Sequence, residues 1–194
     1  MAKKKGLVKG VLFLVLILGV LILGLLLSRR SKQRQPGRGI AGQKIITQNF
    51  PEQQNRANAP DFTVPRLGGG NFTLSSLKGK VIILNFWSTG CLPCRQEIPD
   101  FVELYKKYKD NGLEIVGACL DSEARVKPFA KAVGINYILV LAGQEIGRQY
   151  GGIRYIPTTF IIDRRGNIAK KHIGYTSRET FEKEIKELLS EKTE

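Results

Sequence analysis

The stretch that decides the fold runs from residue 81 to residue 94 and reads Val-Ile-Ile-Leu-Asn-Phe-Trp-Ser-Thr-Gly-Cys-Leu-Pro-Cys. Its first seven residues form an apolar run broken only by Asn85, as expected of a strand that is buried on both faces. The apolar side chains that follow, from Ile98 to Tyr108, recur at helical spacing. Cys91 and Cys94 therefore fall at the junction between a predicted central strand and a predicted helix.

The position of this cysteine pair predicts redox chemistry. A helix N-terminus offers unpaired N–H groups and a partial positive charge, which stabilise a thiolate, so we expect Cys91 to be a nucleophile. Two intervening residues in a first helical turn bring both sulfurs within bonding distance, and Pro93 is tolerated there because its missing N–H would have no intrahelical partner. Cys91 would attack a substrate disulfide, and Cys94 would then displace the reduced substrate.

Outward from this stretch, short β-branched or aliphatic runs alternate with segments of helical period, which predicts an α/β domain with a mixed central sheet flanked by helices. The predicted strands are 81–87, 113–120, 137–141, 158–162 and 167–173, of which the last two form an antiparallel hairpin. The predicted helices follow Cys91 with a kink at Pro99, cover 126–133 up to Gly134, cover 145–150, and close the chain behind a capping box of Thr176 and Glu179.

The amino-terminal segment has the composition of a membrane anchor. Residues 10–27 are 18 consecutive uncharged residues, which as a helix would span about 27 Å, close to the hydrocarbon thickness of about 30 Å. The run is longer than a signal-peptide core and lacks a small-x-small cleavage site. We therefore predict an uncleaved signal-anchor over 1–28 that meets the lipid bilayer through 7–27, and a flexible polar tether over 29–58.

The charge balance separates this amino-terminal part from the predicted folded domain, residues 59–194. Residues 1–59 hold 11 Lys/Arg and one acid, whereas residues 60–194 hold 20 Lys/Arg and 16 acids. Most of the basic surplus thus lies outside the folded domain, so we expect no nucleic-acid partner. Lysines and arginines flank both ends of the predicted span, and charge alone does not fix its orientation.

The alternatives to a redox pair are a zinc site and two inert core thiols, and inert thiols are not expected at a helix N-terminus. Zinc would require a second pair of ligands, but His172 and Cys119 are single residues in predicted strands. We expect no metal and no other cofactor. Cys119 is predicted to be a small buried hydrophobe, and His172 a surface or half-buried residue.

Residues 85–95 and 151–163 carry a family resemblance. The first reads Asn-Phe-Trp-Ser-Thr-Gly-Cys-Leu-Pro-Cys-Arg and the second Gly-Gly-Ile-Arg-Tyr-Ile-Pro-Thr-Thr-Phe-Ile-Ile-Asp. Together they resemble the membrane-anchored TlpA/ResA-type thioredoxin-like proteins, over nearly all of residues 59–190. Ala59-Pro60-Asp61-Phe62 and residues 74–80 also resemble that family, although peroxiredoxins share them.

The resemblance implies a thioredoxin-like fold, a dithiol/disulfide active site and a catalytic domain outside the cytoplasmic membrane on a single-pass anchor. It also implies disulfide-bearing exported proteins as substrates, with the haem-attachment cysteines of apocytochromes c as candidates, and a membrane electron donor that re-reduces the pair. An oxidant that inserts disulfides would use the same parts, because direction is set by reduction potential.

Two further residues gain a role through this resemblance. Asn85 stands where thioredoxin itself carries a buried Asp, so another base is needed. Glu97 matches an acidic residue of ResA-type members, and we expect it to accept the proton of Cys94 and to oppose thiolate formation. The alternative is a first-turn Glu that only complements the helix dipole.

The remaining site predictions concern the substrate. Ile156-Pro157-Thr158 matches the family's cis-proline loop, whose backbone would pair with an extended substrate segment. Trp87, Gly90, Leu92 and Pro93 are expected to line the active site, and Gly90 departs from the aromatic residue common before the first cysteine.

Two other functions stay open at this point. One is a peroxiredoxin-like thiol peroxidase, which residues 59–62 and Thr89-Gly90-Cys91 suggest. The other is a non-catalytic module that holds an apocytochrome, haem or copper.

Overall fold

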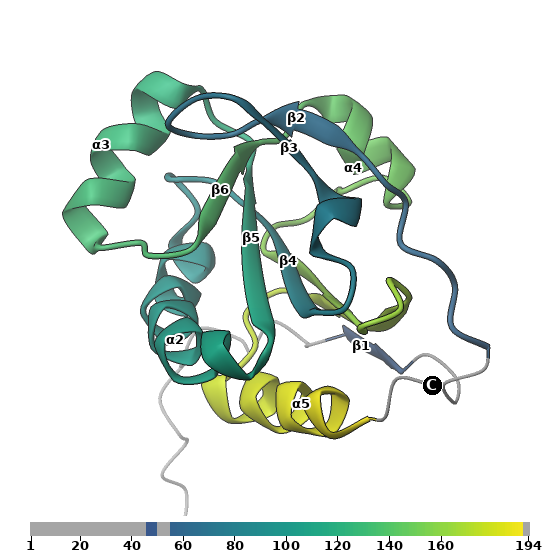
Figure 1. Cartoon of the computed structure of the whole chain (residues 1–194). Coiled ribbons are helices and arrows are strands. Elements are labelled where there is room, and N and C mark those ends of the chain that lie inside the picture. The colour runs from purple at the N-terminus through teal and green to yellow at the C-terminus, as the bar shows by residue number, and fades with distance from the viewer. Residues whose placement is uncertain (1–45, 50–54, 192–194) are drawn as a thin grey trace, which may run out of the picture. The chain divides into compact units, whose positions relative to one another are not determined.

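The central sheet of the computed structural model is mixed, as predicted (Figure 1). Its six strands lie in the order β1-β8-β7-β4-β5-β6, with β4, β5 and β6 parallel and β7, β8 and β1 antiparallel to their neighbours. The strands are β1 (Ile46–Asn49), β4 (Val81–Trp87), β5 (Leu113–Cys119), β6 (Ile138–Leu141), β7 (Thr158–Ile162) and β8 (Ile168–Ile173).

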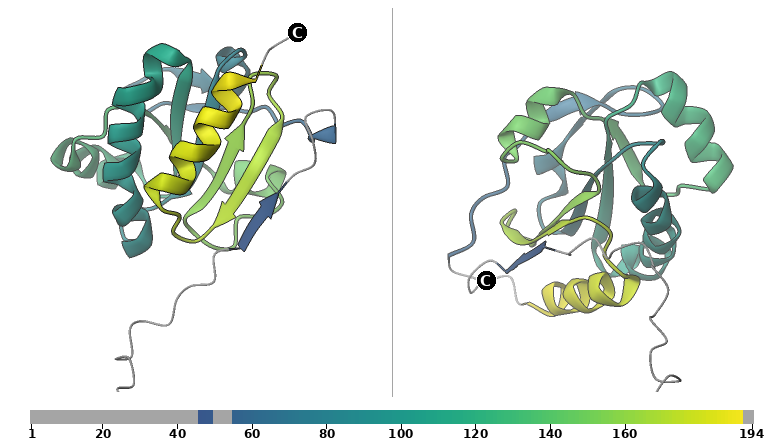
Figure 2. Two further views of the ribbon diagram at one scale, coloured as in Figure 1. Left: turned by 90° about the horizontal axis from the view of Figure 1, so that it is seen from below. Right: turned by 180° about the vertical axis from the view of Figure 1, so that it is seen from behind.

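Helices and a small hairpin cover the two faces of this sheet. In Figure 2, α2 and α5 lie side by side across one face, where they pack on Val81 and Ile83 of β4. The other face carries α4 and the β2–β3 hairpin with η2, whose side chains pack on Leu84 and Phe86. The bounds are β2 (Thr63–Pro65), β3 (Asn71–Thr73), η2 (Leu74–Leu77), α2 (Leu92–Tyr108), η3 (Lys109–Asn111), α3 (Glu123–Val133), α4 (Gln144–Gln149) and α5 (Arg178–Ser190).

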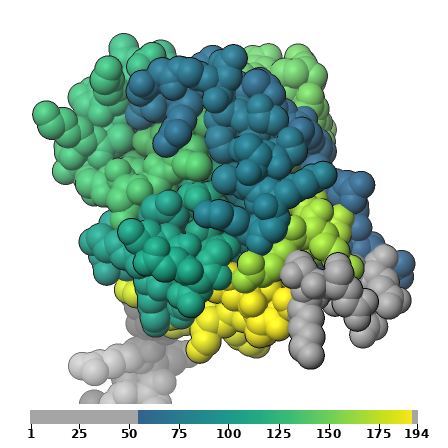
Figure 3. All heavy atoms as spheres, in the orientation of Figure 1, coloured from purple at the N-terminus to yellow at the C-terminus, as the bar shows by residue number. Residues whose placement is uncertain are grey.

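The two covering layers explain the apolar run of β4. Strand residues alternate between the faces of a sheet, so with both faces covered every residue of β4 is buried. Figure 3, drawn from the side of Figure 1, shows the segment from β2 to η2 spread over the surface there. The central position predicted for this strand is confirmed, because β5 and β7 pair with it on either side.

The structure describes residues 46–49 and 55–191. The predicted signal-anchor, residues 1–28, lies outside these residues, as does most of the predicted tether. Among the described residues, no helix combines the length and the apolar character that crossing a membrane requires.

The described parts of the predicted tether are joined to the domain. β1 pairs antiparallel with β8, and Ile168 N donates to the carbonyl oxygen of Ala57 (2.8 Å). Arg56 forms ion pairs with Asp163 (3.0 Å) and Glu191 (2.8 Å). In place of a free chain, β1 covers the backbone groups of β8 that would otherwise form an open sheet edge.

Two local predictions are wrong. The N-cap of α5 is Ser177, whose Oγ accepts from Thr180 N (3.4 Å), so the predicted capping box of Thr176 and Glu179 is displaced by one residue. His172 is fully buried, at 0% exposure, because α5 covers β8. The helix end at Gly134 is confirmed, with the positive φ of 71° that glycine adopts readily, and α2 continues through Pro99.

Candidate active site

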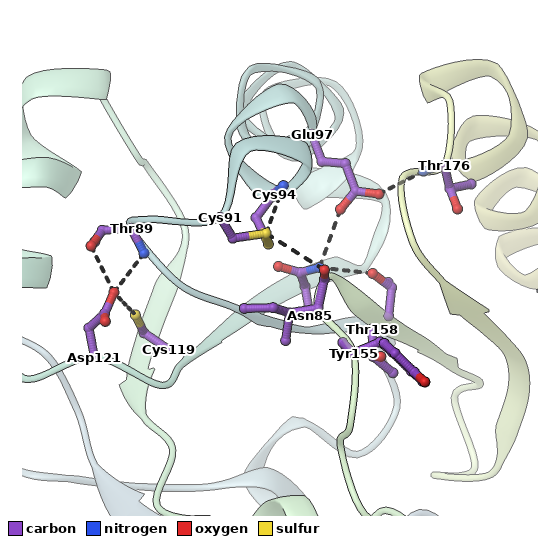
Figure 4. The surroundings of a disulfide bond; sticks show 12 residues. Asn85, Thr89, Cys91, Cys94, Glu97, Cys119, Asp121, Tyr155, Thr158 and Thr176 are labelled. Atoms are coloured by element: carbon purple, nitrogen blue, oxygen red, sulfur yellow. Dashed lines mark hydrogen bonds between the residues drawn. A yellow bond between two sulfur atoms is a disulfide. The ribbon is translucent and has the colours of Figure 1, made fainter. Parts of the chain in front are cut away.

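Cys91 and Cys94 form a disulfide at the N-terminus of α2 (Figure 4). Cys91 is the N-cap residue, and its Sγ accepts a hydrogen bond from the backbone N–H of Cys94 (3.2 Å). In the reduced protein the same N–H group points at the position where a thiolate on Cys91 would carry its charge. Cys91 is half-buried, whereas Cys94 is only 1% exposed. Only the first sulfur is therefore placed to meet a protein substrate.

The loop before the disulfide is fixed by Asp121, a residue that the sequence analysis missed. One carboxylate oxygen, Oδ2, accepts from Thr89 N (2.6 Å) and from Thr89 Oγ1 (2.8 Å). Asp121 follows the parallel neighbour of β4, so the two strand ends bring it beside the loop. The sequence signal that could have identified Asp121 is its position directly after a predicted buried strand, where functional side chains are often found.

Cys119 lies beside Asp121 and takes no part in the disulfide. Its Sγ is 4.0 Å from Asp121 Oδ2. Burial raises the pKa of the Cys119 thiol to about 11. The side chain is 0% exposed, which confirms the prediction that Cys119 is a buried hydrophobe; a thiol with a raised pKa is also a poor nucleophile near neutral pH.

Glu97 is fully buried, at 0% exposure, in the second turn of α2. Its Oε1 accepts from the backbone N–H of Thr176 (2.8 Å), and its Oε2 accepts from Asn85 Nδ2 at a longer 3.5 Å. Burial, and to a smaller extent the nearby charge of Asp100, raise the pKa of Glu97 to about 8, against the lowering effect of the two hydrogen bonds. A solvated first-turn Glu, the alternative considered above, has neither this position nor this burial.

Asn85 and Glu97 belong to a row of polar side chains beneath α2 and α5. Asn85 of β4 pairs in register with Thr159 of β7, which pairs with His172 of β8. Asn85 Nδ2 donates to Thr159 Oγ1 (2.8 Å). His172 Nε2 is 2.7 Å from Glu184 of α5. Each of the two helices thus places one carboxyl group over this row.

The loop before β7 faces the disulfide. The Ile156-Pro157 peptide bond is cis, as expected from the resemblance, and the carbonyl oxygen of Ile156 lies 3.7 Å from Cys91 Sγ. Thr158 is buried, and its Oγ1 donates to the carbonyl oxygen of Tyr155 (2.6 Å). The structure therefore gives Thr158 a supporting place in the loop, whereas Tyr155 is 70% exposed.

The predicted wall residues divide into two groups. Leu92 is 66% exposed, Gly90 is exposed with open space at its Cα, and Pro93 is half-buried. Trp87 is buried behind them and packs on Phe129 of α3, with 5.7 Å between ring centroids. Leu92, Gly90 and Pro93 therefore form the accessible rim, and Trp87 supports it from the core.

Comparison with known proteins agrees with this geometry. The model of the AhpC/TSA family matches residues 56–171. Thiol-disulfide oxidoreductase ResA of Bacillus anthracis is 39% identical over 132 residues, which cover 67% of this chain and 76% of that protein. Thioredoxin-like protein YneN of Bacillus subtilis is 35% identical over 136 residues, with coverages of 68% and 79%.

A solved structure extends the comparison. The crystal structure of a thiol:disulfide interchange protein of the thioredoxin family from Chlorobium tepidum TLS is 37% identical, with a TM-score of 0.65, and the match covers 70% of this chain and 97% of that one. With the paired cysteines at a helix N-terminus, these findings show that the chain belongs to the AhpC/TSA family and is a thiol-disulfide oxidoreductase with a thioredoxin-like fold.

Proposed function

We propose that this oxidoreductase is a membrane-tethered, extracytoplasmic reductant of disulfides in exported proteins. The observation that carries the direction is the buried carboxyl group of Glu97, one helical turn from Cys94 on the same face of α2. The ionised form of Glu97, which is populated as the pH approaches its pKa of about 8, opposes a thiolate on the pair. Strongly oxidising pairs owe their potential to a stabilised reduced form, so a carboxylate at this position makes the pair more reducing.

The reaction follows from the two cysteines and Glu97. Cys91, as a thiolate, attacks one sulfur of a substrate disulfide, forms a mixed disulfide, and releases the first substrate thiolate, which takes a proton from water. The thiol of Cys94 gives its proton to the carboxylate of Glu97. Cys94 then attacks Cys91 Sγ and expels the second substrate thiolate. Two electrons pass to the substrate, and the pair becomes the disulfide observed here.

The loop beside Cys91 supplies the binding surface for the substrate. A chain joined to Cys91 in a mixed disulfide passes next to the backbone of Ile156, whose carbonyl oxygen is 3.7 Å from Cys91 Sγ. Backbone pairing at Ile156 would give affinity with little dependence on the substrate's side chains. The exposed side chains of Leu92 and Tyr155 add apolar contacts on the rim.

The cellular setting completes the proposal. The predicted span over residues 7–27 would hold the catalytic domain at the outer side of the membrane, and a membrane electron donor would return the disulfide to the dithiol. The likeness to proteins named ResA supports this setting. The haem-attachment cysteines of apocytochromes c are proposed as substrates on the same family resemblance.

The test begins with the reduction potential of the Cys91–Cys94 pair in glutathione or dithiothreitol buffers. We expect a value near or below about −250 mV, whereas a value near −120 mV would indicate a disulfide donor. Cys94→Ser should accumulate mixed disulfides with substrate proteins, and Cys91→Ser is the matched control that should trap none. A chain that forms no reversible disulfide would instead be a binding module.

Location has a separate measurement. A Tyr155→Cys substitution in a Cys91→Ser, Cys94→Ser background places a thiol at a position that is 70% exposed, and this thiol should react in intact cells with a maleimide that cannot cross membranes. Protection of that thiol until the cells are lysed would contradict the proposed side of the membrane. This outcome would leave the chemistry of the pair untouched.

The peroxidase alternative gains no support from the site. Thr89 Oγ1 donates to Asp121 and is thereby directed away from Cys91, and Cys91 is bonded to a second cysteine. Peroxide turnover that persists in Cys94→Ser at an undiminished rate would restore that function.

A further inference from the structure

The two carboxyl oxygens of Glu97 have partners of different kinds. Oε1 faces a backbone N–H group, that of Thr176 at 2.8 Å, which can only donate. Oε2 faces the side-chain amide of Asn85, with Nδ2 at 3.5 Å. Both present partners are donors, so the arrangement fits an ionised carboxylate. A protonated Glu97 would carry its proton on Oε2, because Oε1 faces the Thr176 N–H, which can donate a hydrogen bond but cannot accept one.

That proton would meet the wrong atom of Asn85. In the present orientation the Nδ2 group of Asn85 donates both to Glu97 Oε2 and to Thr159 Oγ1 (2.8 Å). A proton on Oε2 would therefore point at another donor and find no acceptor. The residues concerned are almost inaccessible, with Glu97 at 0%, Thr159 at 1% and Asn85 at 4% exposure. A buried polar group without a partner is costly, and here little water is at hand to supply one.

A rotation of the Asn85 side-chain amide removes this conflict, because Oδ1 and Nδ2 then exchange places. Rotation of the terminal amide replaces Nδ2 with Oδ1 and needs almost no additional room, because the two groups are similar in size. Oδ1 would accept from Glu97 Oε2–H. It would also accept from Thr159, since a hydroxyl can donate as well as accept.

We propose that the amide of Asn85 turns over whenever Glu97 gains or loses its proton, and that Asn85 is thereby a positioning residue for proton transfer from Cys94. With Glu97 ionised, Nδ2 donates to Glu97 Oε2 and to Thr159 Oγ1. With Glu97 protonated, Oδ1 accepts from both. Leucine at residue 85 would serve neither state, and aspartate would add a second buried negative charge beside the first.

Other titratable groups surround Glu97 and must be separated from it. Asp100 lies on α2, Tyr175 precedes Thr176, Tyr137 precedes β6, and His172 is the register neighbour of Thr159. Burial raises the pKa of Tyr137 and of Tyr175 above their ordinary value. In the disulfide form Cys91 and Cys94 do not titrate, so that form is used for the test.

The test follows the amide directly by NMR of the full-length chain in its disulfide form. The nuclear Overhauser effect between the Nδ2 protons of Asn85 and the methyl group of Thr159 is measured at about pH 6 and about pH 10, on either side of the Glu97 titration. We expect a strong effect at high pH and a loss of most of it at low pH. Glu97→Gln, which cannot titrate, should give one intensity at both. Equal intensities in the wild type would overturn the proposal.

A kinetic measurement tests whether Asn85 affects the step in which Cys94 loses its proton. The proposal rests on the role of Glu97 in the proposed function, and single-turnover reaction with oxidised glutathione separates the two steps. Asn85→Leu should slow the second step, attack by Cys94, about tenfold, while the first step keeps its rate. Asn136→Leu makes the same chemical change at an exposed site and should alter neither. An unchanged second step in Asn85→Leu would also overturn the proposal, whereas the NMR result stands or falls without any turnover.

Discussion

Replacing Glu97 by glutamine should stabilise the disulfide form of the protein, by an amount that grows with pH. The pKa of Glu97 is about 8 in the folded chain against 4.5 for an unperturbed Glu. Below pH 4.5 the carboxyl group is protonated in both the folded and the unfolded chain, so its ionisation does not lower the free energy of unfolding. Between 4.5 and about 8 the unfolded chain releases this proton while the folded chain retains it, so the free energy of unfolding falls.

The size of the effect follows from linkage. Each pH unit in that window lowers the free energy of unfolding by about 1.4 kcal/mol, which gives about 3 kcal/mol at pH 7 and about 5 kcal/mol above pH 8. The glutamine of the Glu97→Gln variant has no proton to lose, yet its amide oxygen can still accept from the Thr176 backbone N–H that now bonds Oε1. The difference between variant and wild type should therefore be small near pH 4.5 and reach its full value above pH 8.

Urea unfolding of both proteins at a series of pH values measures this difference. Glu103→Gln is the matched control, because Glu103 lies on the same helix but is exposed and ion-paired with Lys106 (2.9 Å). The control should show no stabilisation that grows with pH. A difference between Glu97→Gln and wild type that stays constant from pH 5 to pH 9 would refute the argument that Glu97 is buried without charge compensation.

Three further predictions concern the surroundings of the site. Asp121→Asn should lower the free energy of unfolding by about 1–3 kcal/mol, because the charged acceptor of Thr89 N and Oγ1 is lost; chemical denaturation measures this, and an unchanged midpoint would contradict it. Iodoacetamide should rapidly label the half-buried Cys91 of the reduced native protein at pH 8 and should label Cys119 only after unfolding, since Cys119 is buried and its pKa is about 11; mass spectrometry locates the labels, and rapid labelling of Cys119 would contradict it. Glu184→Gln should cost about 1–3 kcal/mol through its 2.7 Å contact with buried His172; thermal unfolding tests this, and a stabilised variant would contradict it.

The elements that the sequence predicts well are those whose pattern is local. The apolar run of residues 81–87 matches β4 to the residue, and Gly134 marks the end of α3. The position of the cysteine pair followed from the same junction of strand and helix. In each case the signal lies in neighbouring residues, so no tertiary contact is needed to read it.

His172 shows why other features could not be predicted. A regular strand would place residues 169 and 172 on opposite faces of the sheet, because their separation is odd. The register between β7 and β8 shifts between Ile161 and Ile162. As a result Ala169 and His172 both pack toward α5, with Phe181 as a shared neighbour. The sequence alone does not indicate this bulge, so the burial of His172 could not be predicted from the strand pattern, and a surface or half-buried position was expected.

The burial of Glu97 could have been predicted from the sequence. Cys94, Ile98 and Phe101 mark the buried stripe of α2, and a residue three after Cys94 and four before Phe101 lies on that stripe. Asp121 carried a weaker signal, since its role depends on two strand ends meeting in space. The strand β1 carried almost none, because its four residues, Ile-Thr-Gln-Asn, are mostly polar and pair only with an edge.

The two carboxyl groups over the polar row differ in the one property that matters for proton transfer. Glu184 has the imidazole of His172 at 2.7 Å, a partner that can carry a positive charge. Glu97 has a backbone N–H and an amide, neither of which can. A cation beside Glu97 would lower its pKa, and the carboxylate would then be too weak a base to take a proton from a thiol efficiently. The neutral partners, Thr176 N–H and Asn85, therefore leave burial as the main influence on Glu97, and burial raises its pKa to about 8, near the ordinary value of a cysteine thiol.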